Sequence, residues 1–126
     1  MISKDTSYML GITTFNRAHH VKTLTRSLER CSLPKNAIVN VFDDHSIEYD
    51  EQQLSTWFGP NTTVFRNAMN LGADKNMHRM FEAFVGSKKD FIFILDSDLI
   101  LDPQLFELLP ELLDRSKGVL SVYNSA

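Results

Sequence analysis

Two pairs of carboxylates follow apolar, strand-like runs in this sequence. They are Asp43 and Asp44 after residues 38–42, and Asp96 and Asp98 after residues 91–95. Because a carboxylate is costly to desolvate, it rarely ends a buried strand without a partner. Carboxylates two residues apart at the mouth of a sheet suit a divalent cation, which prefers hard oxygen ligands. The sequence therefore predicts a site that binds its ligand through a metal.

Strand-like and helix-like segments alternate along the chain and must position these carboxylates. Apolar residues at helical spacing mark the helices, including one over residues 51–58 and one that closes near Gly86. Near-continuous apolar strands in such an alternation predict an α/β fold, with a parallel sheet covered by helices on both faces. The strands are expected at residues 8–14, 37–42, 62–66, 91–95 and 118–123.

The last expected helix has a start signal and an internal break signal. Asp102 followed by Pro103 predicts the start, because a carboxylate can cap a helix and proline suits its first position. Pro110 lies inside the apolar pattern of this helix and should kink or split it.

The order of the strands decides whether the two acidic pairs meet. If the first strand is central, right-handed crossovers predict the order 3-2-1-4. The carboxyl ends of strands two, one and four are then neighbours, where ligands of such sheets bind. At about 4.8 Å per strand, Asp43 and Asp98 would lie roughly 10 Å apart with residues 14–16 between them. That gap suits a nucleoside with its phosphates.

Composition limits the class of protein. The chain has 126 residues, with 43% hydrophobic and 23% charged residues, which predicts one globular domain over residues 1–126. The net charge of −3 argues against a nucleic-acid partner. Cys31 is the single cysteine, so a reducing compartment is expected. No apolar run is long enough for a transmembrane segment, and we expect a cytoplasmic protein, free or peripheral to the inner face of the membrane.

Four short motifs occur in a fixed order along this chain. They are Thr13-Thr14-Phe15-Asn16-Arg17, Asp43-Asp44-His45-Ser46, Asn70-Leu71-Gly72 and Leu95-Asp96-Ser97-Asp98. Each is weak alone, but together they resemble the GT-A glycosyltransferases, and in particular the inverting family 2. The resemblance spans Tyr8 to about Tyr123. It implies a Rossmann-like fold and transfer of a sugar from a nucleotide-diphospho-sugar, expected to be uridine-linked, to a hydroxyl of a saccharide or other acceptor.

The resemblance places the first two motifs at the nucleobase. Residues 13–17 would flank the base, with Phe15 packing near it and Thr13, Thr14, Asn16 and Arg17 around it. Asp43 would accept a hydrogen bond from the uracil imide, which fits because a carboxylate is only an acceptor and the imide is a donor.

The resemblance places the last motif at the metal. Asp98 would coordinate Mn²⁺ or Mg²⁺, and Asp96 would contact the metal, a metal-bound water or the ribose. An acidic domain repels a diphosphate, and a bound divalent cation would make the local charge attractive to the diphosphate. The same cation would stabilise negative charge on the leaving nucleoside diphosphate.

Further residues complete the expected nucleotide-sugar site: Asp44, Asn70, Gly72, Lys75 and Ser97. Gly72 would allow close approach of the backbone, and Lys75, Asn76 or Arg79 could face phosphate. The family often has an Arg-Asn pair where this chain has Lys75-Asn76.

Structural roles for the same residues stay open. Asp43 and Asp44 could form a turn or a helix cap. Asp98 could begin a loop, and Lys75 and Arg79 could be solvated helix charges.

Three other functions compete with glycosyl transfer. The first is a nucleotide-sugar-binding module without catalysis. The second is a phosphoacceptor receiver domain, whose acidic pair follows its first strand, whereas here the acidic sites follow strands two and four. The third is an aspartate-nucleophile phosphatase, whose Asp-x-Asp lies on its first strand, whereas about ninety residues precede Asp96 here.

The general base is not expected in this chain. Members of the family are considerably longer, and their second half supplies the acceptor site and a carboxylate base. The acidic residues after Asp98 belong to the last expected helix, so we expect this chain to hold the donor-binding half.

Overall fold

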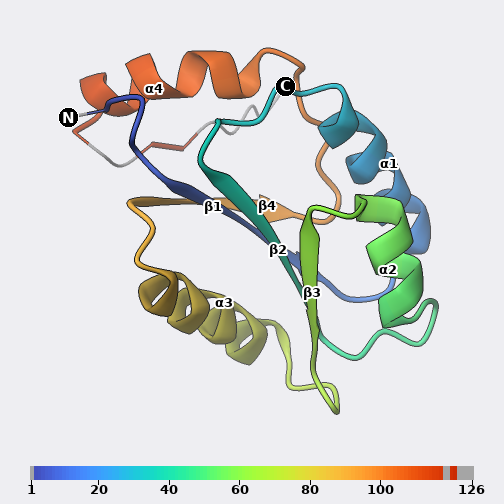
Figure 1. Ribbon diagram of the computed structural model, residues 1–126. Helices are drawn as coiled ribbons and strands as arrows, with labels where there is room; N and C mark the ends of the chain where they lie inside the picture. Colours follow the sequence, from blue (N-terminus) through green and yellow to red (C-terminus); the bar gives the residue numbers. More distant parts are fainter. Residues whose placement is uncertain (1, 118–119, 122–126) are drawn as a thin grey trace.

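The described part of the chain folds around a four-stranded parallel sheet (Figure 1). The computed structural model describes residues 2–117 and 120–121. Strands and helices alternate along this part of the chain, as the apolar patterns predict. The elements are β1 (Tyr8–Thr14), α1 (Ala18–Glu29), β2 (Ala37–Asp43), α2 (Glu51–Phe58), β3 (Thr62–Arg66), α3 (Ala73–Ser87), β4 (Phe91–Asp96) and α4 (Leu105–Arg115).

The strand order is β3-β2-β1-β4, which confirms the order predicted from the sequence. Thr14 at the end of β1 pairs with Asp43 of β2, and Thr13 pairs with Asp96 of β4. The carboxyl ends of β2, β1 and β4 therefore lie side by side, and each carries polar residues to the same edge of the sheet.

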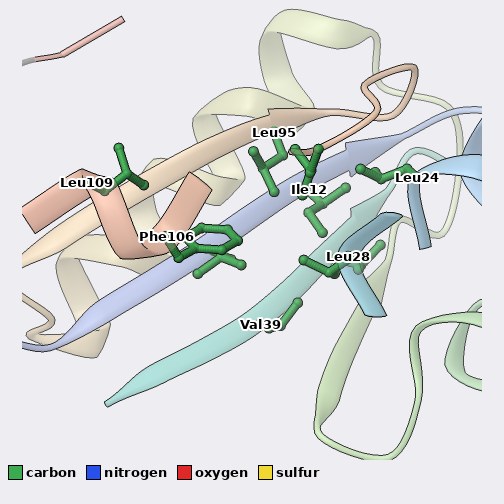
Figure 2. Close-up of a cluster of buried hydrophobic side chains, with 10 residues drawn as sticks. Ile12, Leu24, Leu28, Val39, Leu95, Phe106 and Leu109 are labelled. Carbon is green, nitrogen blue, oxygen red and sulfur yellow. The ribbon is translucent and has the colours of Figure 1, made fainter. Parts of the chain in front are cut away.

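Side chains of alternate strand positions pack into separate hydrophobic clusters on the two faces of the sheet. Leu10 and Ile12 of β1 face α1 and α4, where Phe106 and Leu109 of α4 close the larger cluster (Figure 2). Met9 points to the other face and packs with Phe42 of β2 and Met80 of α3. Helices thus cover both faces, and the predicted α/β class is confirmed.

Most predicted elements agree with the structure. Residues 8–14, 51–58 and 62–66 coincide with β1, α2 and β3, while β2 and β4 are each one residue longer than expected. The predicted strand 118–123 lies largely outside the described residues, and its two described members, Leu120 and Ser121, are in no strand.

The predicted start of the last helix is wrong. The helix begins at Leu105, and its N-cap is Gln104 without a side-chain cap. Asp102 instead accepts a hydrogen bond at Oδ1 from the Gln104 N–H at 2.8 Å, so that it forms a local turn ahead of the helix. The helix is not split at Pro110 either, since residues 105–115 remain one element.

Replacing Gly11 with alanine is expected to lower the free energy of unfolding by about 1–3 kcal/mol. An added Cβ would lie 2.5 Å from Met80 Sδ and 2.9 Å from Met80 Cγ. Because Met80 is fully buried, it cannot move aside without disturbing the packing between β1 and α3. Urea denaturation followed by circular dichroism measures the change.

The matched control is Gly86→Ala in α3. A Cβ at Gly86 meets nothing within 4 Å, and alanine favours an exposed helix position by up to about 1 kcal/mol. The control should therefore be neutral or stabilising, and an equal loss of stability in both variants would contradict the packing explanation.

Candidate functional site

A cavity of about 480 Å³ lies at the carboxyl edge of the sheet. Most residues predicted for the site line it, and they come from the ends of β1, β2 and β4 and from the segment before α3. The predicted residues in its wall are Thr13, Thr14, Phe15, Arg17, Asp44, Asn70, Gly72, Asp96, Ser97 and Asp98. The wall also contains Asn76, one of the three residues expected to be able to face phosphate, and Ala73 and Met77, which the sequence patterns did not assign to the site.

Asp43 lies elsewhere than expected. Its side chain is 0% exposed, and it is not in the cavity wall. Its Oδ1 accepts a hydrogen bond from the Thr14 hydroxyl at 2.7 Å, and its Oδ2 lies 3.4 Å from Arg66 Nη1 on the paired strand β3. Ser46 donates to it as well. Asp43 therefore joins neighbouring strands, and its carboxylate does not face a ligand.

Asp44 is the carboxylate of this pair that borders the cavity. Its oxygens accept hydrogen bonds from the backbone N–H groups of Leu71 and Gly72 at 2.8 and 2.9 Å. Asn67 donates to it as well at 2.8 Å. Gly72 has φ +93°, a conformation that L side chains rarely adopt, which explains glycine at this position. Asp44 thus holds the segment before α3 against the end of β2.

Asn16 stabilises the loop after β1 through hydrogen bonds and does not line the cavity. Its Oδ1 accepts hydrogen bonds from the N–H groups of Ile47 at 2.9 Å and Glu48 at 3.3 Å. Its carbonyl accepts a hydrogen bond from the Tyr49 hydroxyl at 2.9 Å. Burial raises the pKa of Tyr49, which keeps this phenol protonated and able to donate. The flanking residues Phe15 and Arg17 both reach the cavity.

Of the three α3 residues expected to be able to face phosphate, Asn76 is the one in the cavity wall. Lys75 is exposed and outside the cavity wall, and Arg79 is outside it too. Asn76 is buried, and its Nδ2 donates to the Phe42 carbonyl at 2.8 Å. The first residue of α3, Ala73, sets which residues of the helix face the sheet. With this start, Asn76 faces the sheet and Lys75 lies at the surface. Arg17 is the only cationic residue among the described residues of the wall.

Asp96 and Asp98 project at the end of β4, and both are exposed in the cavity wall with Ser97 between them. Among residues 2–117 and 120–121, no group of three His, Cys, Asp or Glu side chains could hold a metal ion. Two carboxylates nevertheless suit Mg²⁺ or a similar cation, because such ions are often held by one or two carboxylates together with phosphate oxygens and water. The donor set therefore fits a cation that arrives with a phosphorylated ligand.

A family model described as glycosyl transferase family 2 matches residues 10–124, which include all of these motifs. The chain belongs to glycosyl transferase family 2. This match confirms the resemblance stated from the motifs. No curated protein matches the sequence significantly.

Solved structures show the same fold. The chain is similar to S. aureus TarS 1-349, with a TM-score of 0.73 and 19% identity, over 94% of this chain and 39% of that one. It is also similar to another S. aureus TarS structure, with a TM-score of 0.72 and 20% identity, over 88% of this chain and 20% of that one. This family 2 chain thus has the GT-A fold but spans well under two thirds of those proteins. No helix in the described ranges is long and apolar enough to cross a membrane.

Replacing Arg66 with alanine is expected to destabilise the protein by about 3–5 kcal/mol, because it leaves the buried Asp43 carboxylate without its cation. Arg66 also donates to the backbone carbonyls of Tyr49 and Ser46 at 3.0 and 2.6 Å. Chemical denaturation measures the difference from wild type.

The control is Arg115→Ala, which removes an exposed ion pair with Glu111. Exposed pairs contribute below about 1 kcal/mol, so this variant should unfold close to wild type. A similarly small effect of Arg66→Ala would show that Asp43 does not depend on its ion pair.

Proposed function

We propose that this chain forms the nucleotide-sugar-binding part of a metal-dependent, inverting glycosyltransferase. The donor is a uridine-linked diphospho-sugar, and the acceptor is a hydroxyl of a saccharide or another molecule. The observation that carries the proposal is one cavity, in a family 2 chain, whose wall joins Phe15, Asp44 and the Asp96–Asp98 pair. These groups match the parts of a nucleotide sugar: a flat base, a hydrogen-bond donor on that base and a diphosphate.

Phe15 and Asp44 form the nucleobase end of the proposed site. Phe15 is 47% exposed at the cavity, so its ring is available for stacking on a base. Both carboxylates are buried, with Asp44 2% exposed, but Asp44 suits the uracil imide better than Asp43 because only Asp44 lies in the cavity wall. Asp44 Oδ1 already accepts from Leu71 and Asn67. Among the described residues, Oδ2 accepts only from Gly72, so its second lone pair can accept a hydrogen bond from a ligand.

Asp96 and Asp98 form the diphosphate end. The wall carries three carboxylates and the cationic Arg17, so its charge is net negative and repels a diphosphate. Asp96 and Asp98 would hold Mn²⁺ or Mg²⁺. The cation would neutralise the negative charge that develops on the leaving nucleoside diphosphate. Gly72 and Ala73 at the start of α3 also line the cavity, and their small size leaves room for the ligand.

The carboxylates of the wall have roles in binding, so we assign none of them as the general base. The chain spans 39% of TarS 1-349, and activity of the whole protein is part of the proposal. An assay for hydrolysis of a uridine-linked donor distinguishes an enzyme from a binding module, because only the enzyme would release free uridine diphosphate.

Isothermal titration with uridine diphosphate tests the metal assignment. Wild type is expected to bind uridine diphosphate in the presence of Mn²⁺. In chelator its affinity should fall at least about 10-fold, because the carboxylates of the wall then repel the diphosphate. Asp98→Asn should lose a comparable factor in Mn²⁺. Guanosine diphosphate, titrated in parallel, should bind more weakly than uridine diphosphate.

The control for this titration is Asp5→Asn, which makes the same change of charge ahead of the amino end of β1, away from the cavity. It should bind like wild type. Equal affinity in chelator and in Mn²⁺, or an unaffected Asp98→Asn, would reject a metal at this site.

Replacing Phe15 with alanine is expected to weaken binding of uridine by about 5- to 150-fold, because base–aromatic stacking contributes about 1–3 kcal/mol. Fluorescence competition or titration calorimetry with uridine alone isolates the base from the phosphates. Phe81→Ala is the matched control, since Phe81 is 42% exposed but outside the cavity wall. If both variants bind uridine like wild type, Phe15 does not contact the base.

A further inference from the structure

Ser46 is a buried residue of the loop between β2 and α2 that does not line the cavity. Its hydroxyl donates to Asp43 Oδ1 at 2.6 Å, and its Oγ accepts a hydrogen bond from the Asn16 N–H at 2.7 Å. Its backbone N–H donates to Asp43 Oδ2 at 2.9 Å. A single hydroxyl therefore connects the buried carboxylate to the loop after β1.

The donor and acceptor of each hydrogen bond made by the Ser46 hydroxyl follow from the chemistry of its two partners. The ionised Asp43 carboxylate can only accept, so the Ser46 proton must point to it. The Ser46 lone pairs then face Asn16, whose backbone N–H can only donate. Thr14 donates to the same Asp43 oxygen at 2.7 Å, so both ends of the segment 14–16 depend on Asp43, one directly and one through Ser46.

The loop that Ser46 holds is conformationally costly. Asn16 and Arg17 have φ of 53° and 56°, and two successive non-glycine residues in the left-handed region need support from their surroundings. This turn separates Phe15 from Arg17, and both line the cavity. A change in the turn would therefore move both side chains with respect to Asp44 and Asp96.

We infer that Ser46 is a positioning residue of the nucleotide site. It holds the Asn16–Arg17 turn in its left-handed conformation, so that Phe15 and Arg17 keep their places in the cavity wall. The inference rests on the proposed function for its ligand and on the hydrogen bonds of Ser46 for its mechanism.

The test is Ser46→Ala, measured in two ways. Uridine diphosphate in Mn²⁺ should bind about 10-fold more weakly, because the variant leaves the partly buried N–H of Asn16 without its Ser46 acceptor and the turn relaxes. Amide hydrogen exchange in the free protein should become at least about 10-fold faster at residues 16 and 17 and stay unchanged in the core strands. Affinity for Mn²⁺ alone should be unaffected.

Ser87→Ala is the matched control. The Ser87 hydroxyl also donates to an oxygen, the Phe84 carbonyl, and accepts from a backbone N–H, that of Lys89, but at the far end of α3. This variant should leave nucleotide affinity and exchange at residues 16 and 17 at wild-type values.

Each outcome decides between explanations. Wild-type affinity in Ser46→Ala overturns the inference, whether or not exchange at residues 16 and 17 accelerates. Accelerated exchange throughout the chain also overturns it, because Ser46 would then support only global stability. If wild type itself binds no nucleotide, the proposed function fails. Local exchange then still decides whether Ser46 holds the turn.

Discussion

The buried carboxylate of Asp43 is the interaction on which the carboxyl edge of the sheet depends. Such a charge is stable inside a protein only when its oxygens are fully paired. Here the partners come from three segments: Thr14 of β1, Ser46 of the loop after β2, and Arg66 of β3. Because the Asp43 carboxylate requires these hydrogen-bond and ion-pair partners, the three segments come together at the edge of the sheet where the cavity lies.

Neighbouring residues at this edge divide structural and binding functions. Asp43 and Asp44 are adjacent, and successive residues of an extended chain point to opposite sides. Asp43 accordingly faces the interior, and Asp44 reaches the cavity while it fixes the segment that leads into α3. The cavity is thus built on a polar frame whose hydrogen bonds are formed before any ligand arrives, which limits the reorganisation that binding requires.

The sequence predicted the strand order and most of the cavity wall, because apolar runs locate strands and parallel strands present their carboxyl ends together. It did not predict the place of Asp43, since the partner Arg66 becomes visible only once the register of β2 and β3 is known. Lys75 was misplaced because the phase of α3 depends on its first residue, Ala73. The start of α4 was misjudged because Asp102 can form a turn as readily as a cap.

The missing side chain at Gly11 has a consequence for the shape of the ligand site. Met80 of α3 occupies the space that a side chain at residue 11 would fill, so α3 packs directly on β1 at this glycine. The same helix carries Asn76 and Met77 into the cavity wall. The aperture of the cleft is therefore set partly by a residue in the middle of the sheet.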